Sequence, residues 1–226
     1  MRHLLKFSPV LLLVIAACGT EPTNTNTSGQ VSLRVVNAYT APVDVLIDGN
    51  VAITALAAGT IGTASPASGN HTVMLRPTSG ASVSQSITST AGAMGTLAVV
   101  RAADGSAAVA VLDDTNSVVP AGATKVRVLH FAPNAGTLQV YRTQPDFQQP
   151  ISWQFPFTYQ ANPTSLSAPF YQSTVGSWEV RVWQTPADAS GWAGATVKVV
   201  IPLLSGEKKT VLILDAPGGG VKIQVI

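Results

Sequence analysis

The chain has 226 residues, of which only 11% are charged, and its formal net charge at pH 7 is +2. Arg2 and Lys6 lie at the very start, so the rest of the chain holds 13 − 2 = 11 basic residues against 11 acidic ones. A neutral chain lacks the basic surface that binds nucleic acid, so we predict no nucleic-acid partner. The single cysteine excludes a disulfide framework and a zinc site of several thiolates.

The first 17 residues have the pattern of a secretory signal peptide. A positive start, Met1–Lys6, precedes the apolar run Leu11–Ile15 and the small residues Ala16 and Ala17. The apolar run is too short to span a bilayer, which needs about 20 residues. We therefore predict a signal peptide over residues 1–17 rather than a membrane helix.

The only cysteine follows this segment directly. Ile15-Ala16-Ala17-Cys18 resembles the lipobox of bacterial lipoproteins. The resemblance implies that Cys18 receives a diacylglyceryl group and an N-acyl chain such as palmitate, which together anchor the protein stably to a membrane. The alternative is an ordinary signal peptide with an incidental cysteine. Residues 18–30 are polar and predict a flexible tether, and Gly19 favours the outer membrane or the cell surface.

From Val31 onward the hydrophobic pattern has a period of two, which is typical of half-buried β-strands. Asp48-Gly49-Asn50 predicts a tight hairpin turn. We expect a first domain over residues 31–115, with strands near 31–35, 43–47, 51–53, 60–64, 71–76, 82–88, 96–101 and 107–112.

Residues 116–123 are predicted to form a linker, after which the first pattern returns over residues 124–226. Lys125–His130 echoes Ser32–Asn37, with Arg127 in the place of Arg34. Gly176–Val182 echoes Gly69–Leu75, and Thr210–Leu214 echoes Thr96–Val100. Many short strands in two similar halves predict an all-β chain of two tandem immunoglobulin-like antiparallel β-sandwich domains.

Two motifs resemble those of the DUF4397 family. Arg127–Pro133 is similar to the opening "RVVHASPDAP" of that family, and Pro42–Gly49 is similar to its following "PAVDVYVDG". The family consists of extracytoplasmic bacterial and archaeal domains, often in tandem and often on lipoproteins. It has no established activity, so the resemblance implies a fold and a location rather than a reaction.

Few residues suggest chemistry. His130 and its counterpart Asn37 are either ligand-binding groups or, as we favour, hydrogen-bonded residues that close a strand. His71 corresponds to Trp178 in the second half, which favours a structural role. Asp48 and Asp104 precede glycine and fit turns better than a calcium site. We find no serine-hydrolase, P-loop or dinucleotide motif and predict no catalytic residue, no metal site and no cofactor.

The aromatic residues are distributed unevenly. Apart from Phe7, the chain has 13 aromatic residues, and all except Tyr39 lie in the second half. Exposed rings could bind a sugar or a protein, whereas buried rings would form a local core. The candidate ligand-binding residues are Trp153, Phe155, Tyr159 and Trp192.

These patterns predict a membrane-anchored extracytoplasmic lipoprotein that is not an enzyme. Its expected role is binding, adhesion or envelope structure, with the membrane held through Cys18 and with a cell-envelope protein or glycan as partner. The alternative function is carbohydrate binding through the loop aromatics of the second domain.

Overall fold

The computed structural model describes residues 31–112, 118–145, 151–157, 170–184, 195 and 197–226. Within these ranges the chain is all-β: it consists of strands and connecting turns, and no helix occurs. Accordingly, the described part of the chain has no helix of the length and apolarity needed to cross a membrane.

The first half forms two four-stranded sheets. One has the order β4-β1-β7-β8 and the other the order β3-β2-β5-β6. Neighbouring strands are antiparallel except β1 and β7, which are parallel. The strands are β1 (Ser32–Asn37), β2 (Val43–Ile47), β3 (Asn50–Leu56), β4 (Ile61–Ala64), β5 (Gly69–Pro77), β6 (Val83–Ser89), β7 (Met94–Arg101) and β8 (Ala107–Leu112).

The second half repeats this arrangement. Its sheets have the orders β12-β9-β15-β16 and β11-β10-β13-β14, which are the first two orders with eight added to each strand number. Again one pair is parallel, here β9 and β15. The strands are β9 (Ala123–Phe131), β10 (Leu138–Thr143), β11 (Ile151–Phe157), β12 (Tyr171–Thr174), β13 (Gly176–Gln184), β14 (Val197–Leu203), β15 (Lys208–Asp215) and β16 (Val221–Val225).

Strand register makes the two halves comparable residue by residue. Arg34 lies opposite Thr96 in the first parallel pair, and Arg127 lies opposite Thr210 in the second. Arg34 and Arg127, which correspond in sequence, therefore also occupy equivalent positions in the structure. Each position in these strands of one half therefore has a direct counterpart in the other half.

Each half has an apolar core between its two sheets. In the first half the core includes Leu33, Val45, Val73 and Leu97. In the second half the corresponding core also holds a large ring, Trp178. Its indole N–H donates to the carbonyl oxygen of Thr174 at 3.0 Å, so the polar edge of the ring is satisfied.

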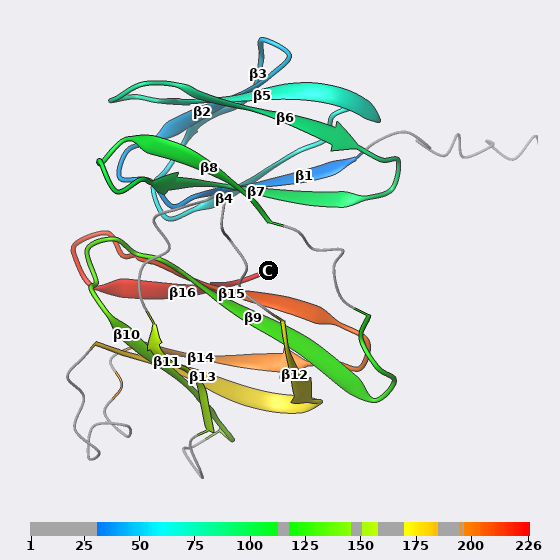
Figure 1. Cartoon of the computed structure of the whole chain (residues 1–226), viewed down its shortest axis with the longest axis vertical. Coiled ribbons are helices and arrows are strands. Elements are labelled where there is room, and N and C mark those ends of the chain that lie inside the picture. Colours follow the sequence, from blue (N-terminus) through cyan, green and yellow to red (C-terminus); the bar gives the residue numbers. More distant parts are fainter. Residues whose placement is uncertain (1–30, 113–117, 146–150, 158–169, 185–194, 196) are drawn as a thin grey trace, which may run out of the picture.

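A third core joins the two halves. Figure 1 shows the four sheets as successive layers, with β1, β7 and β8 facing β9, β15 and β16 across the middle. The buried side chains there come from both halves: Val36, Ala38, Ala98, Val100, Ala110 and Leu112 meet Leu129, Phe131, Leu212 and Leu214. The two inner sheets are thus buried on both faces, which explains the unbroken apolar runs in β7 and β15.

The predicted strands of the first half all exist, and β2 and β8 begin and end where the sequence indicated. The predicted hairpin turn is also confirmed, since Asp48 and Gly49 both have positive φ, at 51° and 82°. Two consecutive residues of positive φ form the turn type that best matches the twist of a β-hairpin.

Candidate functional site

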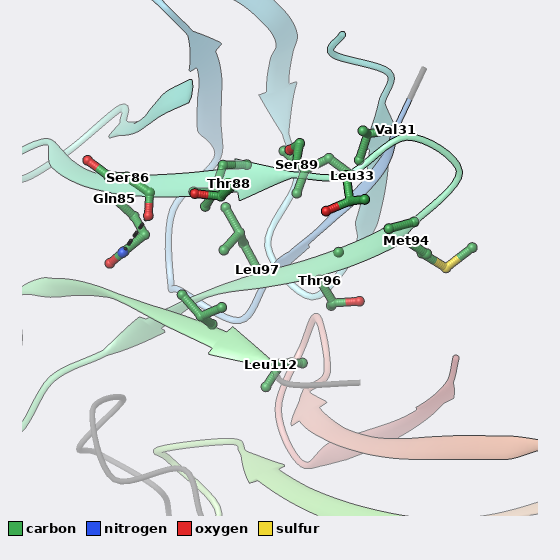
Figure 2. A pocket seen from close by; sticks show the side chains of 15 residues that line it. Val31, Leu33, Gln85, Ser86, Thr88, Ser89, Met94, Thr96, Leu97 and Leu112 are labelled. Atoms are coloured by element: carbon green, nitrogen blue, oxygen red, sulfur yellow. Dashed lines mark hydrogen bonds between the residues drawn. The ribbon is translucent and has the colours of Figure 1, made fainter. Parts of the chain in front are cut away.

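The strongest candidate site is a cavity of about 430 Å³ at the side of the first sandwich, where its two sheets part between the edge strands β6 and β8. Figure 2 shows Leu97 of β7 between the ribbons of β7 and β6. No charged residue lines the cavity. Its lining consists of Val31, Leu33, Gln85, Ser86, Ile87, Thr88, Ser89, Thr90, Ala93, Met94, Gly95, Thr96, Leu97, Val111 and Leu112.

The floor and the rim of the cavity differ in chemistry. Leu33 and Leu97 are almost completely buried and belong to the core of the first sandwich. The β6 side supplies hydroxyl groups and the Gln85 amide, which donates to the Ser86 carbonyl at 2.9 Å (Figure 2). Such a site accepts an apolar group at the bottom and neutral polar groups at the edge.

Apolar side chains at the mouth remain open to solvent. Val111 lies two residues after Val109, so its side chain points to the same, inner face of the sheet. Its exposed fraction is nevertheless 49%, and that of Met94 is 52%. A core-facing valine that is half exposed shows that the sandwich is not closed at this end.

The comparison with the second half gives a reason for the cavity. Strand register places Ser89 of β6 where β14 has Leu203, and Gly95 of β7 where β15 has Lys209. Leu203 is fully buried, whereas Ser89 offers only a hydroxymethyl group to the same space. Ser89 and Gly95 therefore fill less of the space near this edge than Leu203 and Lys209 fill in the second half.

The mouth of the second sandwich has a different character. Between β14 and β16 lies a more open groove of about 600 Å³, and its lining includes Lys209, Lys222 and Pro202. The two mouths therefore differ in charge, although they occupy equivalent places in the fold. Of these two mouths, the first is the one with no charged side chain in its lining.

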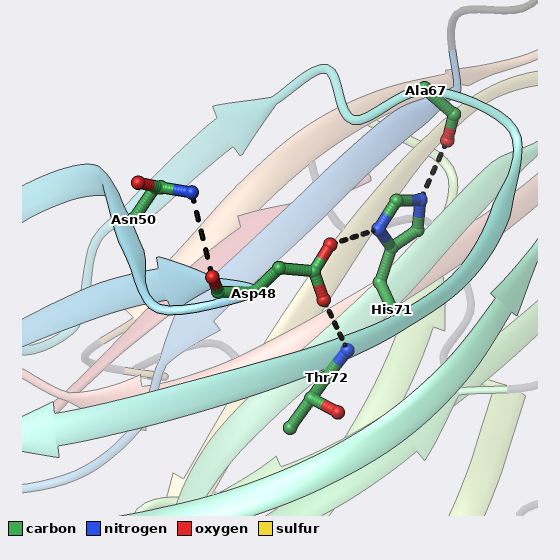
Figure 3. Close-up of polar contacts among 5 residues, drawn as sticks. All are labelled: Asp48, Asn50, Ala67, His71 and Thr72. Atoms are coloured by element: carbon green, nitrogen blue, oxygen red, sulfur yellow. Dashed lines mark hydrogen bonds and ion pairs between the residues drawn. The ribbon is translucent and has the colours of Figure 1, made fainter.

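His71 and Asp48 form the most conspicuous polar group in the first half (Figure 3). The imidazole Nδ1 lies 2.7 Å from a carboxylate oxygen of Asp48, and Nε2 lies 2.9 Å from the carbonyl oxygen of Ala67. Because both ring nitrogens face acceptors, the charged imidazolium is favoured. The Asp48 carboxylate, followed by the Ala67 carbonyl, raises the pKa of His71.

This pair is a structural link rather than a catalytic dyad. The second Asp48 oxygen accepts the Thr72 N–H at 2.9 Å, and the His71 and Thr72 bonds lower the pKa of Asp48. With both nitrogens bonded in this way, His71 has none directed toward a substrate. The pair ties the β2–β3 turn to β5, which agrees with the structural role predicted for His71.

Asp44 is the other aspartate of the segment Pro42–Gly49, and it also makes structural hydrogen bonds. One oxygen accepts the Ala55 N–H at 2.8 Å, where Ala55 has a positive φ of 48°. The other oxygen accepts from the Arg76 guanidinium at 2.9 Å. The Ala55 and Arg76 bonds lower the pKa of Asp44. The motif thus holds the irregular pairing of β2 and β3 in place.

His130 and Asn37 perform the same local task in the two halves. His130 Nδ1 accepts the Ala132 N–H at 3.2 Å, and Nε2 donates to the Gly136 carbonyl at 2.7 Å. The Asn37 side-chain oxygen accepts the Tyr39 N–H at 3.0 Å, and its amide donates to the Ala41 carbonyl at 2.9 Å.

The favoured interpretation of these two residues is therefore confirmed: both are hydrogen-bonded residues at a strand end. Both side chains are completely buried. Burial lowers the pKa of His130, although the Gly136 carbonyl opposes that shift. This environment keeps the imidazole neutral, as its acceptor role at Nδ1 requires.

The turn interpretation of Asp104 also holds. Its carboxylate accepts the Ser106 N–H at 2.9 Å and the Ser106 hydroxyl at 2.6 Å, as in a side-chain-stabilised turn. Among the residues that the structure describes, no three His, Cys, Asp or Glu side chains gather as a metal site would require.

The four aromatic candidates lie outside the part of the chain whose side chains are described. Tyr159 and Trp192 lie outside the described residues, and so do the side chains of Trp153 and Phe155 on β11. Cys18 also lies outside them. Among the described rings of the second half, Phe131 and Trp178 are buried, whereas Phe170 and Tyr171 are partly exposed. The guanidinium of Arg142 lies 4.5 Å from the centre of the Trp178 ring.

A smaller cleft of about 250 Å³ lies where the loops of the two halves meet, beside Tyr39, Gly59 and Asn134. Asp215 lines it and accepts the Asn134 amide at 2.9 Å. Burial raises the pKa of Asp215. This cleft is a seam between the halves, and its residues suggest no ligand as clearly as the apolar cavity does.

The fold and the cavity define the class: an all-β protein of stacked sheets with an uncharged lateral cavity. Residues 31–141 match the family model described as Domain of unknown function (DUF4397), which supports that family for this part of the chain. None of the curated proteins compared with the chain matches it.

Among solved structures, the chain is similar to one described as "Alpha-glucan recognition by family 41 carbohydrate-binding modules from streptococcal virulence factors". The TM-score is 0.29 at 10% identity, with 85% of this chain and 95% of that chain covered.

Proposed function

We propose that this chain is a lipid-anchored, extracytoplasmic binding protein without catalytic activity. Its binding site is the cavity between β6 and β8, and its ligand presents an uncharged, aliphatic group. The observation that carries this proposal is the cavity of about 430 Å³, which has an apolar floor and no charged lining residue.

The lining restricts the chemical class of the ligand. A charged group would lose its hydration in this cavity without gaining an ion pair, which is costly. A sugar ring would find no aromatic side chain to stack on, because the lining contains none. An aliphatic group of a few carbons would gain about 25 cal/mol for each Å² of apolar surface that it buries.

The histidines support a role without catalysis. A general base must reach the proton that it removes, at about 3 Å. Both ring nitrogens of His71 and of His130 are instead occupied by hydrogen bonds to neighbouring protein groups. Neither residue lines the cavity.

The location of the protein is proposed from the sequence. The lipobox-like Ile15-Ala16-Ala17-Cys18 and the polar residues 19–30 precede Val31, which itself lines the cavity. A tether of 12 residues would span up to about 40 Å when extended. The lipid on Cys18 would therefore hold the binding site within a few nanometres of the membrane.

The cavity is tested by titrating the full chain, carrying Cys18→Ser, with the neutral fluorescent probe N-phenyl-1-naphthylamine. Ser89→Leu fills the cavity with the side chain that the second half has at this position, and should weaken probe binding at least tenfold. Ser84→Leu adds the same group on the exposed face of β6 and serves as the control. Equal binding by the two variants would contradict the proposed site.

The anchor is tested by expressing the natural chain and Cys18→Ser in a bacterium that has the lipoprotein pathway. The natural chain should sediment with membranes and show the mass of a diacylglyceryl and an acyl group at Cys18. The Cys18→Ser variant should remain in the soluble fraction. If both sediment equally and carry no lipid, the anchor proposal fails.

A further inference from the structure

We infer that β6 is a docking edge for an extended, uncharged segment of a partner protein. This segment adds to the sheet β3-β2-β5-β6 as a fifth strand and places an aliphatic side chain in the cavity. The inference rests on the proposed function, because it names the partner of the same cavity.

The position of β6 in its sheet makes this docking possible. β6 pairs with β5 on one side and with no described strand on the other. The free side of an edge strand presents backbone N–H and C=O groups that can pair with another chain. Ser84, Ser86 and Thr88 are exposed along it, so small hydroxyl side chains leave the edge accessible.

The equivalent edge in the second half is protected, and the comparison is direct. Register places Ser84 where β14 has Lys198, and Thr88 where β14 has Pro202. Charged side chains and proline are the usual means by which a protein blocks pairing at an edge strand. β6 has neither in its seven residues. The molecule thus blocks one of two equivalent edges and leaves the other open.

The cavity supplies the specificity that the edge lacks. Side chains of an added strand alternate between the two faces of the sheet, so every second residue would point toward the space between β6 and β8. Binding of this kind takes affinity from main-chain hydrogen bonds and specificity from pockets for alternate side chains. The apolar floor at Leu33 and Leu97 suits valine, isoleucine or leucine.

The absence of charged residues from β6 and from the cavity lining favours an uncharged segment as the partner. Neither β6 nor the cavity lining offers a charge that could compensate a lysine or glutamate on the incoming strand. A second copy of this chain fits less well. Of the four inward residues of its own β6, Val83 and Ile87 are aliphatic. The other two, Gln85 and Ser89, are polar and do not match the apolar floor.

The test uses a blocked nine-residue peptide of alternating threonine and valine, labelled for fluorescence anisotropy, at low micromolar concentration. The full chain carrying Cys18→Ser should bind this peptide. The double variant Ser84→Lys with Thr88→Pro, which transfers the protection of β14 to β6, should bind it at least tenfold more weakly. Far-UV circular dichroism checks that the variant is folded.

A second probe keeps the test independent of the variant. The same peptide with alternate backbone nitrogens methylated cannot complete a strand ladder, so it should bind the unmodified β6 at least tenfold more weakly. Equal binding of the two peptides would overturn the inference. Concentration-dependent dimers that are abolished by the double variant would also overturn it, in favour of a homotypic edge.

The two proposals fail differently. If the neutral naphthylamine probe binds in a manner sensitive to Ser89→Leu but the peptide does not bind, the cavity stands and the strand partner is wrong. If neither probe binds, the proposed site itself is wrong.

Discussion

Asn37 and His130 show how one position can change its residue type and keep its hydrogen bonds. Each accepts the N–H two residues further on and donates to a carbonyl of the following loop. The sequence alignment of the two halves could find this equivalence, because both residues end the same echoed strand. The partners could not be found, since they lie in loops of different length.

His130→Ala should destabilise the protein by about 2–4 kcal/mol, because it leaves two buried backbone groups without their partner and opens a cavity. His130→Asn should cost less than about 2 kcal/mol, because asparagine performs this task at residue 37. Urea denaturation of the two variants measures both values. If asparagine proves as harmful as alanine, ring volume rather than hydrogen bonding is what matters at this position.

His71 predicts a pH dependence whose sign follows from its raised pKa. A histidine whose folded-state pKa lies above the unfolded value, about 6.5, stabilises the fold below pH 6.5. That contribution is lost as the pH rises through the folded-state pKa. The NMR titration of His71 should therefore have its midpoint above 6.5, and Asp48→Asn should move that midpoint down.

Thermal unfolding provides the stability readout for this pair. The melting temperature of the natural chain should fall more between pH 6 and pH 9 than that of Asp48→Asn, because the variant lacks the carboxylate. Identical pH profiles would show that the Asp48–His71 contact contributes no linkage.

At the scale of elements, the outer strands were the most predictable. Strands with one face in a core and one in solvent alternate in hydrophobicity, as in β5, where Val73 and Leu75 are buried and Thr72 and Met74 are exposed. β7 and β15 show no such alternation, because they are buried on both faces. Their apolar runs predict strands, but an apolar run alone does not reveal that two sheets meet there.

The cavity could not be found from the sequence. It depends on Ser89 and Gly95, which lie on different strands and become significant only once Leu203 and Lys209 are known to be their counterparts. A serine in an alternating strand is otherwise an ordinary edge residue. The signal that was available, the echo between the halves, did not include β6 and β14.

Ser89→Leu should stabilise the first sandwich by about 1–2 kcal/mol, because the added side chain buries apolar surface in a space that is now underfilled. A binding site often costs stability in this way. Chemical denaturation compares the variant with Ser84→Leu, which should be nearly neutral. A loss of stability for Ser89→Leu would mean that the space cannot accept a leucine without strain.

For the whole molecule, the decisive feature is the third core. Its two sides are complementary in size. Where the first half has Ala38 and Ala98, the equivalent positions of the second half have Phe131 and Leu212. Small residues on one sheet receive large residues from the other. The two halves therefore pack directly against each other through a shared apolar core.

A comparison of Gly49 with Gly59 distinguishes the cost of backbone strain from the cost of a steric contact between the halves. Gly49 and Gly59 both have positive φ, but a Cβ at Gly49 would meet nothing, whereas one at Gly59 would lie 3.1 Å from the Asp215 carbonyl oxygen and 2.8 Å from Lys222 Cε. Gly49→Ala should cost about 1 kcal/mol. Gly59→Ala should cost about 1–2 kcal/mol more, because it also pushes against the second half.

Urea denaturation of both variants measures the difference. If the two costs are equal, Lys222 and Asp215 move to accommodate the added methyl group at residue 59, and the contact between the halves is not rigid there.

The size complementarity of the third core also limits how far such a structure can grow. The faces that meet are unlike, so in principle a third sandwich could extend the stack in the same direction. The outward face of the first half, however, exposes Thr72 and Arg76 of β5. In the second half, the outward positions of β13 hold the Glu179–Arg181 ion pair, whose side chains are buried. At these positions β5 and β13 carry polar or charged side chains, where the seam has apolar ones. These positions therefore could not form a second apolar seam like the one that joins the two halves.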